Sequence, residues 1–208
     1  MPSGDIFSLP PLAPQTHLRD DTMTTNPSNL ALLAEKLNTL GLRWMVTGAA
    51  AAAFWAPTRA SVDIDIVLDC GDLDEPAFGA ALGAEYLVDA EMVRNSVATR
   101  RMFNLIPLAG GTKVDVIPLR DEPFEIACFA RRRRLVTDGI DVFVETPEDV
   151  IVSQLQWAKE SLSPRQLADV RALLATAPDL DMEYIDGWVQ RLGLQPVVEA
   201  SREARHDA

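Results

Sequence analysis

Cysteine and histidine are scarce in this chain of 208 residues, which contains two of each. Cys70 and Cys128 lie far apart and have no metal-ligand spacing. We therefore expect two buried, reduced thiols, not a disulfide framework. His17 and His206 lie near the two ends of the chain, and we assign a catalytic role to neither.

Long apolar runs and excess positive charge are also missing. No run reaches the length of a transmembrane helix, and the first residues lack the basic start and apolar core of a signal peptide. We therefore expect a cytoplasmic protein with no membrane partner. The 19 basic residues are outnumbered by 31 acidic ones, for a net charge of -12. This balance argues against coating nucleic acid, although a local basic groove remains compatible with it.

Three regions differ in composition. Residues 1–27 are rich in Pro, Ser, Thr and Asp, and we expect a flexible tail. Residues 28–145 alternate helical and strand patterns, including a hairpin around Gly110-Gly111 and a second one at Asp138-Gly139. Residues 146–208 contain four helical segments. The expected fold class is therefore α/β (α+β), with a mixed sheet flanked by helices and followed by a C-terminal helical bundle.

Two aspartates stand one residue apart in the strand-like run VDIDIVL, and a third lies in KVDVIP. Residues i and i+2 of a strand face the same side, so Asp63 and Asp65 project together. If the strand of Asp115 is a neighbour, three carboxylates converge and need a compensating cation. Oxygen ligands of this kind suit Mg²⁺ or Mn²⁺, and such ions assist in-line displacement at phosphorus.

A glycine turn precedes these acids. An apolar strand ends at Thr47, and Gly48-Ala49 opens an alanine-rich helix. Backbone amides at a helix N-terminus attract phosphate oxygens. Arg59 lies a few residues before the acids and could neutralise phosphate charge. Structural roles are open for each: tight helix–strand packing for Gly48, and an ion pair for Arg59.

Taken together, VTGAAAAAFWAPTRASVDIDIVL and the later KVDVIP resemble the signature of polymerase-β-like nucleotidyltransferases. The helical segment from Glu145 onward is similar to the abortive-infection, toxin-like bacterial branch of that superfamily. The resemblance covers roughly residues 30–190 and implies a nucleotidyltransferase fold and activity. It implies that Asp63 and Asp65 bind the metals that hold a nucleoside triphosphate. Asp115 would complete the metal site and activate an acceptor hydroxyl, and Gly48 and Ala49 would cradle phosphates.

The sequence departs from that pattern at two positions. Ala49 stands where relatives have Gly or Ser, so a hydroxyl contact to phosphate is missing while the backbone amide remains. Gln154 stands where toxin-like relatives carry a lysine, and Lys159 lies about one helical turn further on. Asp169 matches an acidic position of those relatives. A catalytically degenerate nucleotide-binding or regulatory protein is therefore the alternative to an enzyme.

The acceptor is left open by the sequence. RNA or tRNA ends, a protein side chain and a small molecule are the candidate classes, and the toxin-like resemblance adds an antitoxin partner. The cluster of residues 131–134, RRRR, is the only basic run. We favour a solvated helix end near the negative pole of the helix dipole over an RNA contact, because four residues make a small patch on an acidic chain.

Overall fold

The computed structural model describes residues 27–58, 61, 63–161 and 163–203, so most of the predicted tail lies outside the described residues. The helices and strands follow the predicted order of a mixed α/β region and then helices. Their bounds are α1 (Pro27–Thr39), β1 (Trp44–Thr47), α2 (Gly48–Trp55), β2 (Ile64–Leu68), α3 (Glu75–Leu82), β3 (Tyr86–Leu87), α4 (Ala90–Thr99), β4 (Phe103–Pro107), β5 (Val114–Pro118), α5 (Pro123–Arg131), β6 (Arg133–Thr137), β7 (Ile140–Val144), α6 (Pro147–Ser161), α7 (Pro164–Thr176), α8 (Met182–Arg191) and α9 (Gln195–Glu203).

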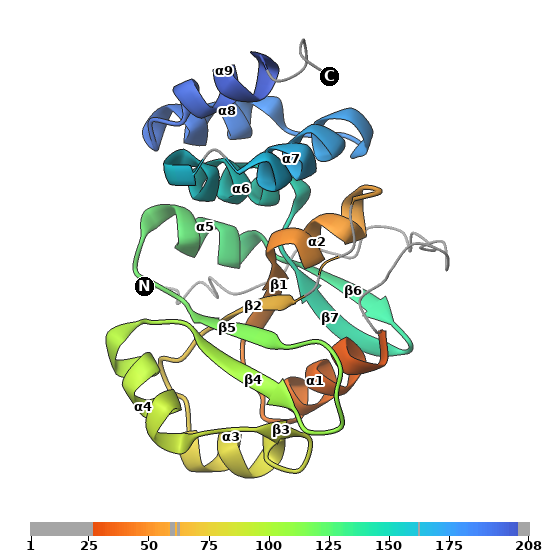
Figure 1. Ribbon diagram of the computed structural model, residues 1–208, viewed down its shortest axis with the longest axis vertical. Helices are drawn as coiled ribbons and strands as arrows, with labels where there is room; N and C mark the ends of the chain where they lie inside the picture. The colour runs from red at the N-terminus through yellow and green to blue at the C-terminus, as the bar shows by residue number, and fades with distance from the viewer. Residues whose placement is uncertain (1–26, 59–60, 62, 162, 204–208) are drawn as a thin grey trace, which may run out of the picture.

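The strands form one mixed sheet of seven strands in the order β3-β4-β5-β2-β1-β7-β6 (Figure 1). β2 pairs with β5 and β1 with β7 in parallel, whereas the other pairs are antiparallel. This arrangement confirms the predicted mixed sheet and both hairpins, β4–β5 and β6–β7. The parallel β2–β5 pair places the strand of Asp115 directly beside the strand of Asp65.

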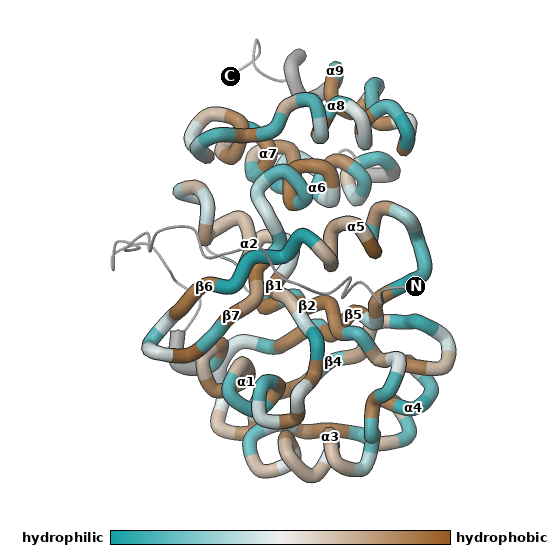
Figure 2. Tube along the Cα trace, turned by 180° about the vertical axis from the view of Figure 1, so that it is seen from behind, coloured by the Kyte–Doolittle hydropathy of each residue, from teal (hydrophilic) through white to brown (hydrophobic). Residues whose placement is uncertain are grey.

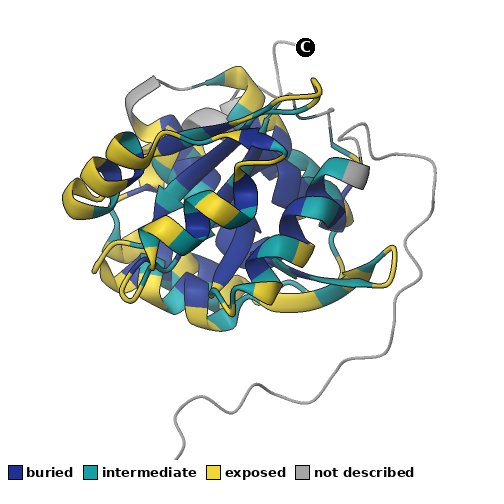
Figure 3. Cartoon of the chain, turned by 90° about the horizontal axis from the view of Figure 1, so that it is seen from below, coloured by how far each residue is buried: buried dark blue, intermediate teal, exposed yellow. Residues whose placement is uncertain are grey.

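One face of the sheet is the core of the domain. Its side chains on β1, β2 and β5 are fully buried at 0% exposure, namely Trp44, Val46, Ile64, Ile66, Leu68, Val114 and Val116. Helices α1, α3 and α4 lie on this side (Figure 1), and the rings of Phe78 and Phe103 meet edge to face at 6.2 Å. Figures 2 and 3 show that hydrophobic and buried residues gather in the central strands. This apolar face makes the sheet a rigid base for the opposite face.

The opposite face carries α2 and α5, above which α6 to α9 stack as the expected C-terminal helical bundle (Figure 1). A buried cluster joins the bundle to the sheet domain. The carboxylate of Asp149 on α6 accepts hydrogen bonds from Arg131 Nε at 3.1 Å, from Thr146 Oγ1 at 2.6 Å and from the Tyr184 hydroxyl. Three helices, α5, α6 and α8, are thereby held together. No helix in the described part of the chain is long and apolar enough to cross a membrane.

The arginine run differs from the predicted solvated helix end. α5 ends at Arg131, and Arg133 and Arg134 belong to β6, where they pair with β7. Arg131 pairs with the buried carboxylates of Glu148 and Asp149 at 3.4 and 3.1 Å. The prediction was wrong for the extent of the helix, because the strand pairing of β6 overrides helix propensity, and for Arg131, which pairs with buried acids on α6. Arg133 and Arg134 are exposed, as a solvated run predicts.

Candidate active site

A row of polar side chains crosses the half-open face of the sheet. Strand register places Thr47 on β1 opposite Asp65 on β2, Asp65 beside Asp115 on β5, and Asp115 opposite Asn104 on β4. Paired residues of neighbouring strands project to the same side, so these four side chains lie in one line. The amide of Asn104 donates to Asp115 Oδ1. We call this line the polar row.

The ammonium group of Lys113 lies close to two of the predicted carboxylates. Its Nζ lies 2.9 Å from Asp115 Oδ1 and 3.8 Å from Asp63 Oδ2. A hydrogen bond to Asp115, together with the charges of Asp115, Asp63 and Asp65, raises the pKa of Lys113 above its ordinary value, against the opposing effect of burial. All three predicted acids therefore stabilise the charged form of one lysine, Lys113. Sequence reasoning missed Lys113, which directly precedes β5 and stands two residues before Asp115.

These donors fit a hard divalent cation by their chemistry, since each offers carboxylate oxygens. Among the described residues, no three His, Cys, Asp or Glu side chains form a ready metal cluster. Instead, the ammonium of Lys113 lies between Asp63 and Asp115. The metal-binding role of Asp63, Asp65 and Asp115 stays a prediction, supported by their shared position beside one cation.

The glycine turn lies directly against the polar row. Gly48 opens α2 with φ of +63°, and a Cβ built there would lie 2.8 Å from Asp65 Oδ2. Only a residue without a Cβ fits both this backbone and this contact. The close approach brings the N-terminus of α2 beside Asp65. Phosphate groups bound to the turn amides would therefore lie on the Asp65 side of the row.

We expect Gly48→Ala to lower the free energy of unfolding by more than Gly41→Ala does. Both glycines have positive φ, +63° and +67°, but a Cβ at Gly41 would meet no atom of the described residues within 4 Å. Each substitution costs about 1–2 kcal/mol for the left-handed backbone, and Gly48→Ala adds the collision with Asp65. Urea unfolding of the two variants measures the difference. Equal losses would show that the crowding against Asp65 does not exist.

A buried carboxylate, that of Glu145, fixes the position of the glycine turn. Glu145 follows β7, is 0% exposed, and accepts hydrogen bonds from Thr47 Oγ1, from Ser153 Oγ at 2.6 Å and from Cys128 Sγ at 3.1 Å. Burial raises the pKa of Glu145 above its ordinary value, because desolvation outweighs these hydrogen bonds. Since Thr47 precedes Gly48, this network fixes the end of β1 and the start of α2.

The raised pKa of Glu145 predicts a pH dependence of stability. A carboxyl group whose pKa is higher in the folded state binds its proton more tightly there than in the unfolded chain. Its contribution to stability is therefore greatest below the ordinary value of 4.5 and falls as pH rises toward the folded-state value. Glu145→Gln removes this dependence, so the difference in unfolding free energy between wild type and variant changes by up to about 1.4 kcal/mol per pH unit in that window. Urea titrations from pH 4 to 8 measure it, and a constant difference would contradict it.

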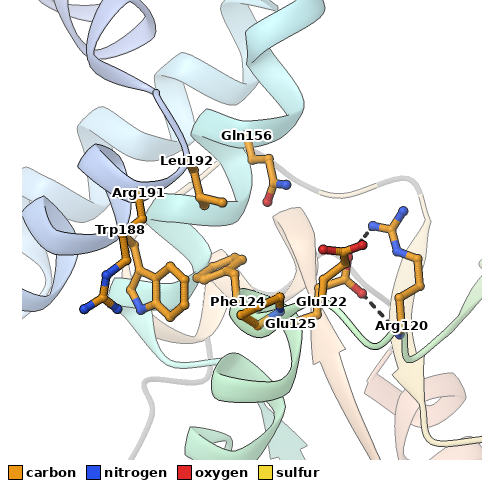
Figure 4. Close-up of a pocket in the computed structure, with 9 residues that line it drawn as sticks. Arg120, Glu122, Phe124, Glu125, Gln156, Trp188, Arg191 and Leu192 are labelled. Atoms are coloured by element: carbon orange, nitrogen blue, oxygen red, sulfur yellow. Dashed lines mark hydrogen bonds and ion pairs between the residues drawn. The ribbon is translucent and has the colours of Figure 1, made fainter.

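Two cavities lie along the same side of the sheet as the polar row. A small one of about 50 Å³ lies beside the row, lined by Met45, Val67 and Ile117, each two residues from a member of the row. A larger one of about 510 Å³ lies between α5, α6 and α8, where Phe124, Trp188 and Gln156 face it (Figure 4). The two cavities share Arg120, Phe124, Glu125 and Gln156, and the smaller one is also lined by Thr47 of the polar row.

The other residues singled out in the sequence lie in different surroundings. Arg59 lies outside the described residues, so its predicted nucleotide contact stays a prediction. Ala49 is buried as the second residue of α2. Gln154 on α6 is 2% exposed, and its side-chain oxygen has no hydrogen-bond partner among the described residues. Lys159 donates to the carbonyl of Leu192 at 3.1 Å, so it binds the end of α8 and does not replace the missing lysine.

Asp169, the acidic position of the toxin-like resemblance, is 2% exposed on α7. Glu145 had no sequence signal of its own, because its partners Thr47, Cys128 and Ser153 come from three other elements. The strand alternation could have indicated Asn104, which lies on the open face of β4 between Phe103 and Leu105, whose side chains are in the core.

Comparisons with known proteins identify the fold. No protein-family model matches the chain, and no curated protein sequence does. An antigenic nucleotidyltransferase-like protein from Paracoccidioides brasiliensis matches in structure with a TM-score of 0.52 and 16% identity, over 86% of this chain and 92% of that one. ANT(2")-Ia in complex with adenylyl-2"-tobramycin matches with a TM-score of 0.50 and 18% identity, over 81% and 97% of the two chains.

A solution structure of the antibiotic-resistance factor ANT(2'')-Ia matches with a TM-score of 0.50 and 16% identity, over 89% of this chain and 99% of that one. Agreement over almost the full length of each neighbour extends from the mixed sheet into the helices that follow it. At sequence identities of 16–18% these comparisons show the fold alone, so the reaction must be argued from the residues of the site. The chain has a nucleotidyltransferase-like fold.

Proposed function

We propose that this protein is a metal-dependent nucleotidyltransferase, which transfers a nucleoside monophosphate from a nucleoside triphosphate to a hydroxyl group. The observation that carries the proposal is the register of Asp65 with Asp115 directly beside the Gly48 turn. A phosphate-binding turn and two adjacent carboxylates are the parts that in-line displacement at phosphorus needs. The nucleotidyltransferase-like fold of the neighbours supports the same reaction class.

Asp63, Asp65 and Asp115 would hold Mg²⁺ or Mn²⁺, with the ammonium of Lys113 moving aside. The bound ion supplies charge neutralisation for the triphosphate and for the departing pyrophosphate. The amides of the Gly48–Ala49 turn bind phosphate oxygens. Asp115 accepts the proton of the acceptor hydroxyl, whose oxygen bonds to the α-phosphorus as the bond to pyrophosphate breaks. Its hydrogen bond from Asn104 orients the carboxylate for this role.

The test combines binding with transfer. Calorimetry with each nucleoside triphosphate, with and without Mg²⁺, should show metal-dependent binding. Incubation with α-³²P-labelled triphosphates and total tRNA, a protein lysate or an aminoglycoside should transfer label to one acceptor class. The adenylyl-2"-tobramycin bound by ANT(2")-Ia favours including a small molecule among the acceptors. Absence of both binding and transfer would refute the proposal.

A second candidate function is nucleotide binding without turnover. Ala49 lacks the hydroxyl that relatives offer to phosphate. Where the toxin-like resemblance expects a lysine, the buried oxygen of Gln154 has no partner in the described part of the chain. Such a protein would bind Mg²⁺ and a triphosphate tightly in calorimetry yet transfer no label to any acceptor. The two measurements above therefore separate this candidate from the enzyme.

The toxin-like branch and an antitoxin partner stay predictions of the sequence resemblance. If the protein is a toxin, induced expression should arrest growth of the host cells. The variant Asp65→Asn should relieve that arrest, because it removes the proposed metal ligand. Equal arrest by both proteins would separate toxicity from nucleotide transfer.

A further inference from the structure

The ammonium of Lys113 occupies the position between two of the proposed metal ligands. Its Nζ lies 2.9 and 3.0 Å from the two carboxylate oxygens of Asp115 and 3.8 Å from Asp63 Oδ2. Magnesium bonds to carboxylate oxygens at about 2.0–2.1 Å. An ion bound to these oxygens and the ammonium in its present position would therefore exclude each other.

The same ammonium balances charge in the polar row. Asp63, Asp65 and Asp115 carry three negative charges, and all three stabilise the charged form of Lys113. Like charges this close repel one another unless a cation lies among them. Lys113 thus supplies a positive charge to the row in the absence of a metal ion, and this charge favours the folded state.

The backbone at Lys113 is fixed, whereas its side chain is partly exposed. The Lys113 carbonyl accepts a hydrogen bond from Ile64 N at 2.9 Å, one residue before Val114 pairs with Ile64 in the β2–β5 register. The side chain is 40% exposed, and its ammonium stands on a flexible four-carbon stem. A displaced ammonium therefore stays within one side-chain length of the start of β5, beside the polar row.

The proposed phosphate site lies next to the same row. Gly48 is in close contact with Asp65, and Asp65 is the register partner of Asp115. A triphosphate bound at the glycine turn brings several negative charges to this end of the strands. Lysine binds phosphate as a point charge. The ammonium displaced from Asp115 gains a new anionic partner when a triphosphate is present, and it loses its partner when a metal ion binds alone.

We propose that Lys113 is a built-in counter-ion, which metal ion and triphosphate displace together and whose ammonium then binds the phosphates. This inference rests on the proposed function. A metal ion alone must compete with the ammonium for Asp63 and Asp115, whereas a triphosphate compensates that competition. Metal ion and triphosphate therefore bind cooperatively, and by linkage each raises the affinity for the other by the same factor.

The test measures Mn²⁺ binding to the full chain by electron paramagnetic resonance of the free ion, with and without α,β-methylene analogues of ATP, GTP, CTP and UTP. Lys113→Met removes the charge and keeps an unbranched side chain. We expect it to raise the affinity for Mn²⁺ alone at least about fivefold, and to lower the factor by which an analogue raises Mn²⁺ affinity at least about fivefold.

Two control variants separate the position of the charge from its amount. Lys113→Arg keeps a cation at the row, so Mn²⁺ alone should bind as weakly as it does to wild type. Lys36→Met removes the same charge from α1, on the other face of the sheet, where Lys36 pairs with Glu85 at 2.8 Å. Both Mn²⁺ affinity and the effect of the analogue should remain those of wild type in Lys36→Met.

Thermal unfolding gives a second measurement that needs no triphosphate. Without metal, Lys113→Met leaves the carboxylates without this counter-ion, so its Tm should be lower than that of wild type. Mn²⁺ should raise the Tm of the variant more than that of wild type, because the variant binds the ion more tightly. Lys113→Gln, which is uncharged but polar, repeats both measurements if Lys113→Met fails to fold.

The outcomes distinguish this inference from the proposed function. Equal affinity of wild type and Lys113→Met for Mn²⁺ alone, an equal effect of the analogue on both, or equal changes in Lys36→Met and Lys113→Met overturn the inference and leave the proposed function intact. If wild type binds no Mn²⁺ with any analogue, the proposed function falls. Binding of Mn²⁺ by Lys113→Met would then still support the counter-ion role, and absence of binding in both proteins would overturn it.

Discussion

Asp65→Asn and Asp115→Asn are each expected to lower nucleotide transfer by about 1000-fold or more, because each removes a carboxylate from the proposed metal site and Asp115→Asn also removes the proton acceptor. The two aspartates are register partners on neighbouring strands. Asparagine keeps the shape of the side chain and removes charge from a crowded cluster, so the folded state should not be destabilised. Labelled transfer under saturating triphosphate and Mg²⁺ measures the effect, and urea unfolding checks the fold.

The matched control is Asp69→Asn. Asp69 follows the other end of β2 and pairs with Arg43, away from the polar row. Asp69→Asn changes the same residue type next to the same strand but away from the proposed site, so transfer should remain close to that of wild type. A similar loss in all three variants would mean that net charge, and not the polar row, controls transfer. Full transfer by Asp65→Asn would remove the proposed site.

Asp149→Ala is expected to lower the free energy of unfolding by about 3–5 kcal/mol, the usual result of removing one partner of a buried ion pair. Asp149 is 0% exposed and holds Arg131, Thr146 and Tyr184 together. Alanine leaves the phenol of Tyr184 without its acceptor and leaves Glu148 as the partner of the Arg131 guanidinium at the junction of α5, α6 and α8. Urea unfolding followed by circular dichroism measures the loss.

Asp141→Ala provides the comparison. Asp141 pairs with Arg134 at 2.8 Å, with both side chains well exposed at 36% and 44%. Exposed pairs contribute about 0–1 kcal/mol, because water screens the charges and the side chains lose entropy on pairing. Equal losses for Asp149→Ala and Asp141→Ala would show that the buried cluster does not anchor the helical bundle to the sheet.

The strand pattern of the sequence predicted the faces of the sheet well. In IDIVL the isoleucines are buried and the aspartate is partly exposed, as a period of two requires. The hairpin signals at Gly110-Gly111 and Asp138-Gly139 were sufficient to predict β4–β5 and β6–β7. These features depend on residues close in sequence, whose local conformation and alternation can be interpreted directly.

The buried polar contacts could not be predicted in this way. Glu145 and Asp149 are acids near the start of α6, where the helix dipole alone accounts for acidic residues. Their buried state and their partners Thr47, Cys128 and Tyr184 depend on how distant elements pack. The run of arginines was misinterpreted for the same reason, since the acid that binds Arg131 lies 18 residues away.

By itself the sequence determined which side chains share a face of each strand, where the glycine turn and the carboxylates stand, and that a helical region follows the sheet. Tertiary structure alone decided that β5 lies beside β2 and that Lys113 lies between Asp63 and Asp115. Side-chain alternation follows from the geometry of one strand. Which strand pairs with which depends on how side chains from the whole chain are buried together, and no short segment contains that information.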